Sequence, residues 1–265
     1  MRVRQSAVAG QFYPFSGEEI EKMIEYFNSI LDENIKDKSV LNIAPRAIIA
    51  PHAGYIYSGF TANFAYRLLK NTKADTIVVI GPSHRVYLNG VSVSDYDLYQ
   101  TPFGDLKIDR DLVEKLKEFD VTFIPSAHHE HSTEVQMPFI KFYKPDAKVV
   151  ELVYGDENPA HLAGIIEYLL KMPNVAVVIS TDLSHYYDIK KANLLDGICL
   201  EAVSELNVKR LHEGCEACGK IGVEAMLIAA KNLRLKPILL DYRTSADTSG
   251  DESQVVGYMS AAFVE

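Results

Sequence analysis

The chain has 265 residues, of which 48% are hydrophobic, so it is long and apolar enough to bury a sizeable core. Its formal net charge of −9 argues against binding to nucleic acid or to an anionic membrane, because both favour a concentrated basic surface. A small molecule or another protein is therefore the expected binding partner.

The cysteines and the N-terminus indicate the compartment. Three cysteines are too few for the disulfide framework of a small secreted domain, so we expect reduced thiols. The first residues lack the apolar stretch of a signal peptide, and no run of about 18 apolar residues occurs anywhere. These features predict a cytoplasmic protein without a membrane span.

The first predicted helix begins after Ser16, because residues 16–19 form a capping box and apolar residues then recur at helical spacing as far as Leu31. Residues 32–39 read as a charged connection. Short apolar runs and helical patterns alternate from there on. Strands are predicted at residues 47–50, 76–80, 148–153, 175–180, 237–242 and 255–263, and further helices at 60–70, 110–118, 159–170 and 190–204.

This alternation predicts an α/β fold with a central, largely parallel or mixed sheet flanked by helices. The sequence contains no Pro/Ser-rich linker, low-complexity tract or internal repeat. We therefore expect residues 1–265 to form a single domain.

Three of the apolar runs end in a turn followed by a histidine, namely His52, His84 and His185, and Asp182 lies in the last of these turns. Ligands of open α/β sheets bind outside the carboxyl ends of the strands, so these side chains are predicted to line one cleft. Imidazoles suit zinc, copper, iron and nickel, which makes His52 and His84 the first candidate metal ligands. Any one of these histidines could instead cap a turn or satisfy a buried hydrogen bond.

Cys218 is the candidate for a third metal ligand. It precedes a helix-compatible run, and a helix N-terminus favours the thiolate. It could equally be a small buried hydrophobe, or half of a solitary Cys-x-x-Cys motif with Cys215.

Other polar segments are less specific. Residues 128–134 offer imidazole and carboxylate groups, but taken alone they predict a solvated loop or a helix N-cap. Residues 245–251, which include Asp247, have the composition of a turn. Tyr55 and Tyr57 could form a pocket wall or be ordinary half-buried aromatic residues.

Taken together and in order, five segments resemble the Memo family, whose members share a fold with class III extradiol dioxygenases of the LigB type. The resemblance covers almost the whole chain. The matching segments are Ala50-Pro51-His52-Ala53-Gly54-Tyr55, Gly81-Pro82-Ser83-His84, Glu130-His131-Ser132-Thr133-Glu134, Ser180-Thr181-Asp182-Leu183-Ser184-His185 and Cys218-Gly219 with Ile221-Gly222.

The resemblance implies roles for individual residues. It assigns His52, His84 and Cys218 to a metal site that accepts iron or copper, and His185 to the acid/base histidine of the dioxygenases. Neighbouring pocket residues implied in this way are Asp182, Tyr55, His131, Glu134 and Asp247. The dioxygenases themselves use two histidines and a glutamate on Fe(II), so a cysteine at the third position is a departure from their pattern.

Three functions remain open at this stage. The leading hypothesis is an iron- or copper-dependent redox enzyme in which His185 moves a proton. The first alternative is a non-catalytic protein that uses the same pocket to bind a peptide or small ligand, and the second is metal-assisted hydrolysis with Asp182 or His185 as the base. The family resemblance also implies a radical-SAM protein as a possible partner.

Overall fold

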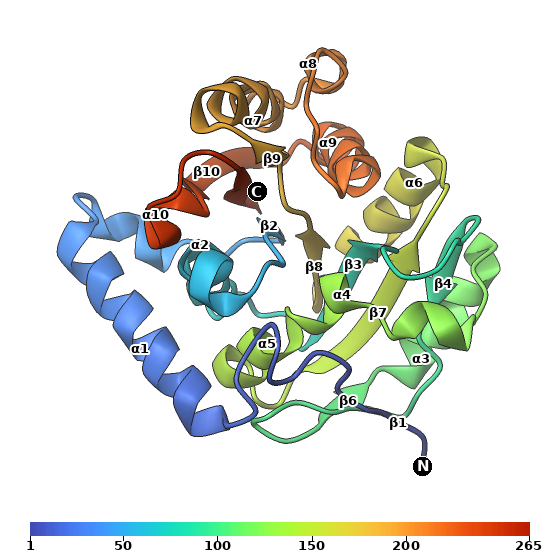
Figure 1. The fold of residues 1–265 in the computed structure, drawn as a ribbon. Coiled ribbons are helices and arrows are strands. Elements are labelled where there is room, and N and C mark those ends of the chain that lie inside the picture. The colour runs from blue at the N-terminus through green and yellow to red at the C-terminus, as the bar shows by residue number, and fades with distance from the viewer.

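Eleven strands form one mixed sheet in the computed structural model, which describes residues 1–265 (Figure 1). The order is β1-β5-β6-β7-β3-β8-β2-β11-β10, with β4 paired to β7 and β9 paired to β11. The strands are β1 (Val3–Arg4), β2 (Ala47–Ala50), β3 (Thr76–Pro82), β4 (Val91–Val93), β5 (Leu98–Tyr99), β6 (Leu106–Ile108), β7 (Lys148–Tyr154), β8 (Val175–Ser180), β9 (His185–Tyr187), β10 (Lys236–Thr244) and β11 (Val255–Val264).

The centre of the sheet is parallel, from β6 through β7, β3 and β8 to β2, whereas β11 runs antiparallel to β2, β9 and β10. Every residue of β2, β3 and β8 is buried. Continuous apolar strands of this kind are typical of a parallel sheet covered on both faces. The predicted α/β fold is confirmed.

Helices cover the two sides of the sheet. In Figure 1, α6, α7 and α9 lie on one side, and α1, α2 and α5 lie on the other. The helices are α1 (Gly17–Asn34), η1 (Lys38–Asn42), α2 (Tyr55–Leu69), α3 (Arg110–Leu116), η2 (Lys117–Phe119), η3 (Pro125–His128), α4 (His131–Glu134), α5 (Met137–Tyr143), α6 (Pro159–Leu170), α7 (Ile189–Ser204), α8 (Val208–Leu211), α9 (Lys220–Leu233) and α10 (Ala246–Ser249). None of them is both long and apolar enough to cross a membrane.

Helices α1 and α2 begin where they do for different reasons. Ser16 caps α1, since its hydroxyl accepts a hydrogen bond from the backbone N–H of Glu19 at 3.4 Å. Helix α2 begins at Tyr55, five residues before the predicted start. Its N-cap is Gly54, and the Tyr55 N–H bonds to the carbonyl of Phe12 at 2.8 Å. A tertiary contact with the N-terminal segment thus supplies a partner that the local sequence does not reveal.

Cys199 of α7 and Cys215, which follows α8, form a disulfide, so the expectation of three reduced thiols is wrong. Their Cα atoms lie 4.9 Å apart because α7 and α8 pack together, and this proximity cannot be inferred from a cysteine count. Cys218 is the free cysteine.

Removing this disulfide should destabilise the protein. The two cysteines are 16 residues apart, and closing a loop of that size stabilises a fold by about 3 kcal/mol in the chain-entropy treatment. We therefore expect Cys199→Ala to lower the free energy of unfolding by about this amount, measured by urea denaturation without reductant. A reductant should cause no further loss of stability in Cys199→Ala. The prediction is contradicted if this variant is as stable as the oxidised wild type.

Candidate functional site

The carboxyl ends of three neighbouring strands bring the predicted site residues together. Strands β3, β8 and β2 are adjacent, and they are followed by His84, Asp182 and His52, respectively. The ring centroids of His52 and His84 lie 5.2 Å apart. The expected convergence at one edge of a parallel sheet is therefore present in the fold.

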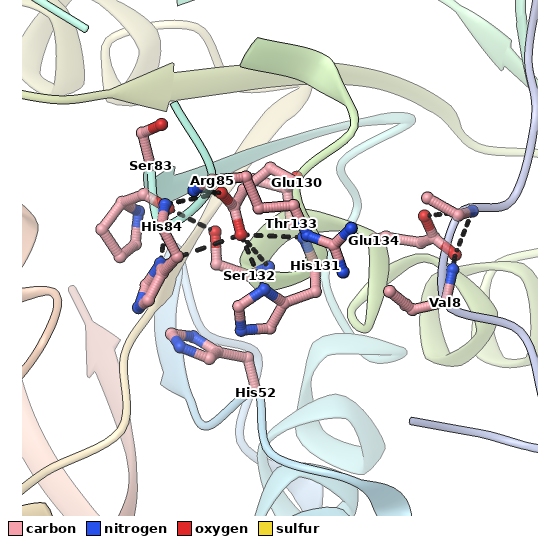
Figure 2. A network of polar contacts seen from close by, with 12 residues as sticks. Val8, His52, Ser83, His84, Arg85, Glu130, His131, Ser132, Thr133 and Glu134 are labelled. Atoms are coloured by element: carbon pink, nitrogen blue, oxygen red, sulfur yellow. Dashed lines mark hydrogen bonds and ion pairs between the residues drawn. The ribbon is translucent and has the colours of Figure 1, made fainter. Parts of the chain in front are cut away.

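His131, the first residue of α4, joins His52 and His84. One ring nitrogen from each of the three lies within 4.8 Å of the other two, a separation that allows them to share a metal ion. Figure 2 shows the three imidazoles turned toward one another. His52 is buried, His131 is partly buried and His84 is exposed, so this histidine cluster opens to the outside next to His84.

Each Nδ1 atom of the histidine cluster has a hydrogen-bond acceptor. Nδ1 of His84 lies 3.1 Å from the carbonyl of Pro82, and Nδ1 of His131 lies 2.8 Å from the Glu130 carboxylate. Because these groups can only accept, they favour the tautomer of each ring that carries its proton on Nδ1.

The same argument holds for His52, whose Nδ1 lies 2.8 Å from the hydroxyl of Ser180. That hydroxyl already donates to the carbonyl of Ser132 at 2.5 Å, so it accepts from His52. In this tautomer the Nε2 atom of each ring is available to bind a metal ion. In metal-binding proteins, a hydrogen bond to the ring nitrogen that does not bind the metal orients the ligating histidine in the same way.

The electrostatic surroundings keep His52 neutral. Burial, together with the nearby rings of His84 and His131, lowers the pKa of His52 well below its usual value. A neutral imidazole is the form that binds a metal ion, so no proton has to be displaced from His52.

Cys218 and Asp182 lie beside His52. The Cys218 sulfur is 3.4 Å from Nε2 of His52 and accepts a hydrogen bond from the Asp182 N–H at 3.3 Å. Burial, followed by the Asp182 carboxylate, raises the pKa of the Cys218 thiol to about 12. The expectation that the start of α9 favours a thiolate is therefore wrong for the metal-free protein, because desolvation outweighs the helix dipole. Metal ligation by Cys218 stays a prediction.

Asp182 positions His52 from the side of β8. Its carboxylate accepts the backbone N–H of His52 at 2.7 Å and lies 3.9 Å from Nε2 of the same residue. Burial raises the pKa of Asp182, while the His52 N–H and the nearby His185 act in the opposite direction. His185, the first residue of β9, thus lies within electrostatic range of both Asp182 and His52.

Other predicted pocket residues have hydrogen-bond partners of their own. The Tyr55 hydroxyl donates to the carbonyl of the residue after α4 at 2.8 Å. Glu134 forms a buried ion pair with Arg4, and the Asp247 carboxylate accepts the backbone N–H of Thr244 at 2.7 Å. Their roles in binding a ligand stay predictions.

An apolar cavity lies beside the histidine cluster. Its volume is about 270 Å³, and Phe12, whose ring centroid is 4.7 Å from that of His131, forms part of its wall. The lining residues are Gly10, Gln11, Phe12, Tyr13, Pro14, Met23, Gly54, Tyr55, Ile56 and Tyr57. Both Tyr55 and Tyr57 thus line a pocket, as the sequence allowed.

Residues 128–134 are more buried than their polar sequence predicts. The expected solvated loop is wrong, because five of the seven side chains are fully buried: His128, Glu130, Ser132, Thr133 and Glu134. The alternative of an N-cap is confirmed, since Glu130 accepts the backbone N–H groups of His131 and Ser132. The density of imidazole and carboxylate groups was the signal for a site, but nothing local showed that the segment packs against β3.

The donor set fits a transition metal. Three neutral imidazoles suit iron, copper and zinc, and the adjacent Cys218 adds a softer donor that favours copper(I) or zinc. The exposed side near His84 leaves room for a further ligand from solution. The site can therefore hold a metal and leave a coordination position open.

Comparisons with known proteins point to one family. The sequence model of the Memo family, described as "Memo-like protein", matches residues 4–262. The chain is 35% identical to a MEMO1 family protein of Aquifex aeolicus over 100% of both chains, and 36% identical to one of Methanosarcina barkeri over 99% of this chain and 100% of that one.

A solved structure shares the fold. It is that of an uncharacterized protein of Escherichia coli K12, with a TM-score of 0.58 and 13% sequence identity, and the match covers 83% of this chain and 99% of the other. At this identity the likeness supports the fold alone.

Proposed function

Because the chain belongs to the Memo family, we propose that it is a metal-binding protein whose histidine cluster holds iron or copper for redox chemistry on a small organic substrate. The observation that carries this proposal is the convergence of His52, His84 and His131, with every Nδ1 engaged behind the site. Histidines that only cap turns are not expected to bring a ring nitrogen each within 4.8 Å of one another.

The surrounding residues have separate tasks in this proposal. A bound iron or copper ion would supply Lewis acidity and one-electron chemistry. Asp182 holds the backbone of His52, and His185, within electrostatic range of both, accepts or returns a proton of the substrate. The apolar cavity beside His131 accommodates an uncharged part of the substrate away from water.

The proposal is tested by reconstituting the protein anaerobically with Fe(II) or Cu(I), followed by elemental analysis. We expect near-equimolar metal in the wild type and loss of the metal in His52→Ala. His161→Ala is a matched control, because His161 pairs with Glu157 and lies outside the histidine cluster. Equal metal content in all three proteins would reject a site at His52.

Redox chemistry needs a second measurement. The metal-loaded protein is screened for O₂ uptake with a panel of small organic substrates, and any active substrate is retested with His185→Ala. Turnover that depends on O₂, metal and His185 is the expected result. Turnover without O₂ would instead indicate metal-assisted hydrolysis.

The apolar cavity favours one alternative function, the binding of a peptide or small ligand without turnover. Aromatic side chains and a volume of about 270 Å³ suit an apolar group of such a ligand. This function predicts that a ligand found in a metal-free thermal-shift screen loses affinity in Ile56→Asp, since Ile56 lines the cavity and is largely exposed. A ligand that binds only the metal-loaded protein would count against it.

A further inference from the structure

Glu130 connects two parts of the histidine cluster that are far apart in the sequence. One carboxylate oxygen accepts the backbone N–H of His84 at 2.6 Å and that of Arg85 at 3.2 Å. The other accepts the N–H groups of His131 at 2.8 Å and Ser132 at 3.1 Å. Figure 2 shows Glu130 between the loop after β3 and the start of α4.

The same carboxylate also reaches an imidazole ring. The oxygen that accepts from the N–H groups of His131 and Ser132, Oε1, also lies 2.8 Å from Nδ1 of His131, so Glu130 contacts both the backbone and the side chain of that residue. The side chain of Glu130 is fully buried. An N-cap needs only the backbone contacts to α4, so the contacts to His84 and to the His131 ring need another explanation.

We propose that Glu130 is a positioning residue for the candidate metal centre, which fixes His131 with Nε2 unprotonated and holds the loop of His84 against it. This inference rests on the proposed metal-binding function. A carboxylate behind a ligating histidine sets the tautomer and orientation of the ring and makes it a stronger donor.

The contacts of Glu130 identify both of its oxygens as acceptors. The backbone N–H groups of His84, Arg85, His131 and Ser132 donate to them. An acceptor 2.8 Å from Nδ1 of His131 favours the tautomer of that ring with the proton on Nδ1.

A shorter side chain at position 130 distinguishes a residue that only caps α4 from one that also positions the histidines. Aspartate is a preferred N-cap residue, so Glu130→Asp can still cap α4. It lacks one methylene group and cannot reach the His131 ring and the His84 backbone together. If Glu130 only caps the helix, this change should have little effect on the histidines.

The first readout is the protonation of the ring nitrogens in metal-free protein, from long-range ¹H–¹⁵N spectra of histidine-labelled samples. In the wild type we expect His131 with a protonated Nδ1 and an unprotonated Nε2. In Glu130→Asp we expect a mixture of tautomers at His131. The signals are assigned with His131→Gln.

The second readout is the affinity for Fe(II), measured by anaerobic competition with a chromophoric chelator, because imidazole ligands such as His131 suit this ion. We expect Glu130→Asp to bind Fe(II) about 10- to 100-fold more weakly than the wild type, as is usual when the partner of a ligating histidine is lost. The matched control is Glu151→Asp, because Glu151 is a buried glutamate of β7 that is bonded to His128 and Thr133 and lies outside the histidine cluster. It should lower the melting temperature and leave both readouts unchanged.

Wild-type ring protonation and Fe(II) affinity in Glu130→Asp would overturn the proposal, and so would equal changes in Glu151→Asp. If Glu130→Asp does not fold, Glu130→Gln replaces it. Its amide presents one NH₂ group, so either the His131 ring or the His84 backbone loses its acceptor, and weaker Fe(II) binding is expected in both orientations. A wild type that binds no Fe(II), Cu(I) or Zn²⁺ would reject the metal-binding function, whereas the metal-free spectra still decide the role of Glu130.

Discussion

Glu134→Ala is expected to lower the free energy of unfolding by about 3–5 kcal/mol, because it leaves the charge of Arg4 buried and unpaired. The two side chains are 1% and 0% exposed, respectively, and form an ion pair. Glu134 also accepts the backbone N–H groups of Ala7 at 2.8 Å and Val8 at 2.9 Å and the hydroxyl of Tyr13 at 2.6 Å. A single carboxylate therefore fastens the N-terminal segment to α4.

The loss is measured by urea denaturation, with Glu33→Ala as the control on an exposed residue of α1. Changes at exposed sites of this kind usually stay within about 0.5 kcal/mol. The double variant Arg4→Met/Glu134→Gln should recover part of the loss, because no unpaired charge remains and the amide oxygen can still accept from Ala7 or Val8. A loss below about 1 kcal/mol in Glu134→Ala would show that water or another group compensates Arg4.

The long strands of the sheet and most of the long helices could be predicted because their signals are local. Strands β2, β3 and β8 are continuous apolar runs, and such runs predict buried parallel strands wherever they occur. The convergence of His52, His84 and Asp182 could be predicted because residues that follow neighbouring parallel strands meet at the same edge of the sheet. The start of α2 could not be predicted, because it depends on a contact with Phe12.

Residues whose role depends on tertiary partners were harder to interpret. His131 was assigned to the pocket and not to the metal ligands, because it follows no apolar run and reaches the cluster from α4, which packs against β3. Glu134 was assigned to the same pocket through the family resemblance, but its carboxylate points toward Arg4, 130 residues earlier in the chain. The pairing of Cys199 with Cys215 likewise depends on how α7 and α8 pack.

The identity of the third metal ligand should depend on the metal. His52 and His84 are common to both possible sets, and the third donor is either His131 or Cys218, whose sulfur lies 3.4 Å from Nε2 of His52. Copper(I) prefers soft thiolate ligands, whereas Fe(II) is satisfied by imidazole. A thiol with a pKa of about 12 gives up its proton only to a metal that binds sulfur strongly.

We therefore expect opposite selectivities in two variants. His131→Ala should weaken Fe(II) binding by more than about 100-fold and should weaken Cu(I) binding less. The expected loss exceeds the usual effect of removing a residue that only hydrogen-bonds to a ligand, because His131 itself would bind the iron. Cys218→Ser should weaken Cu(I) binding by a similar factor and change Fe(II) binding by less than about tenfold. Anaerobic competition with chromophoric chelators measures both affinities, and His129→Ala serves as the control, since His129 is exposed in the same segment and outside the cluster. If both variants lose the same affinity for both metals, His131 and Cys218 bind the same ion together. An unchanged Fe(II) affinity in His131→Ala would exclude the histidine cluster as the iron site.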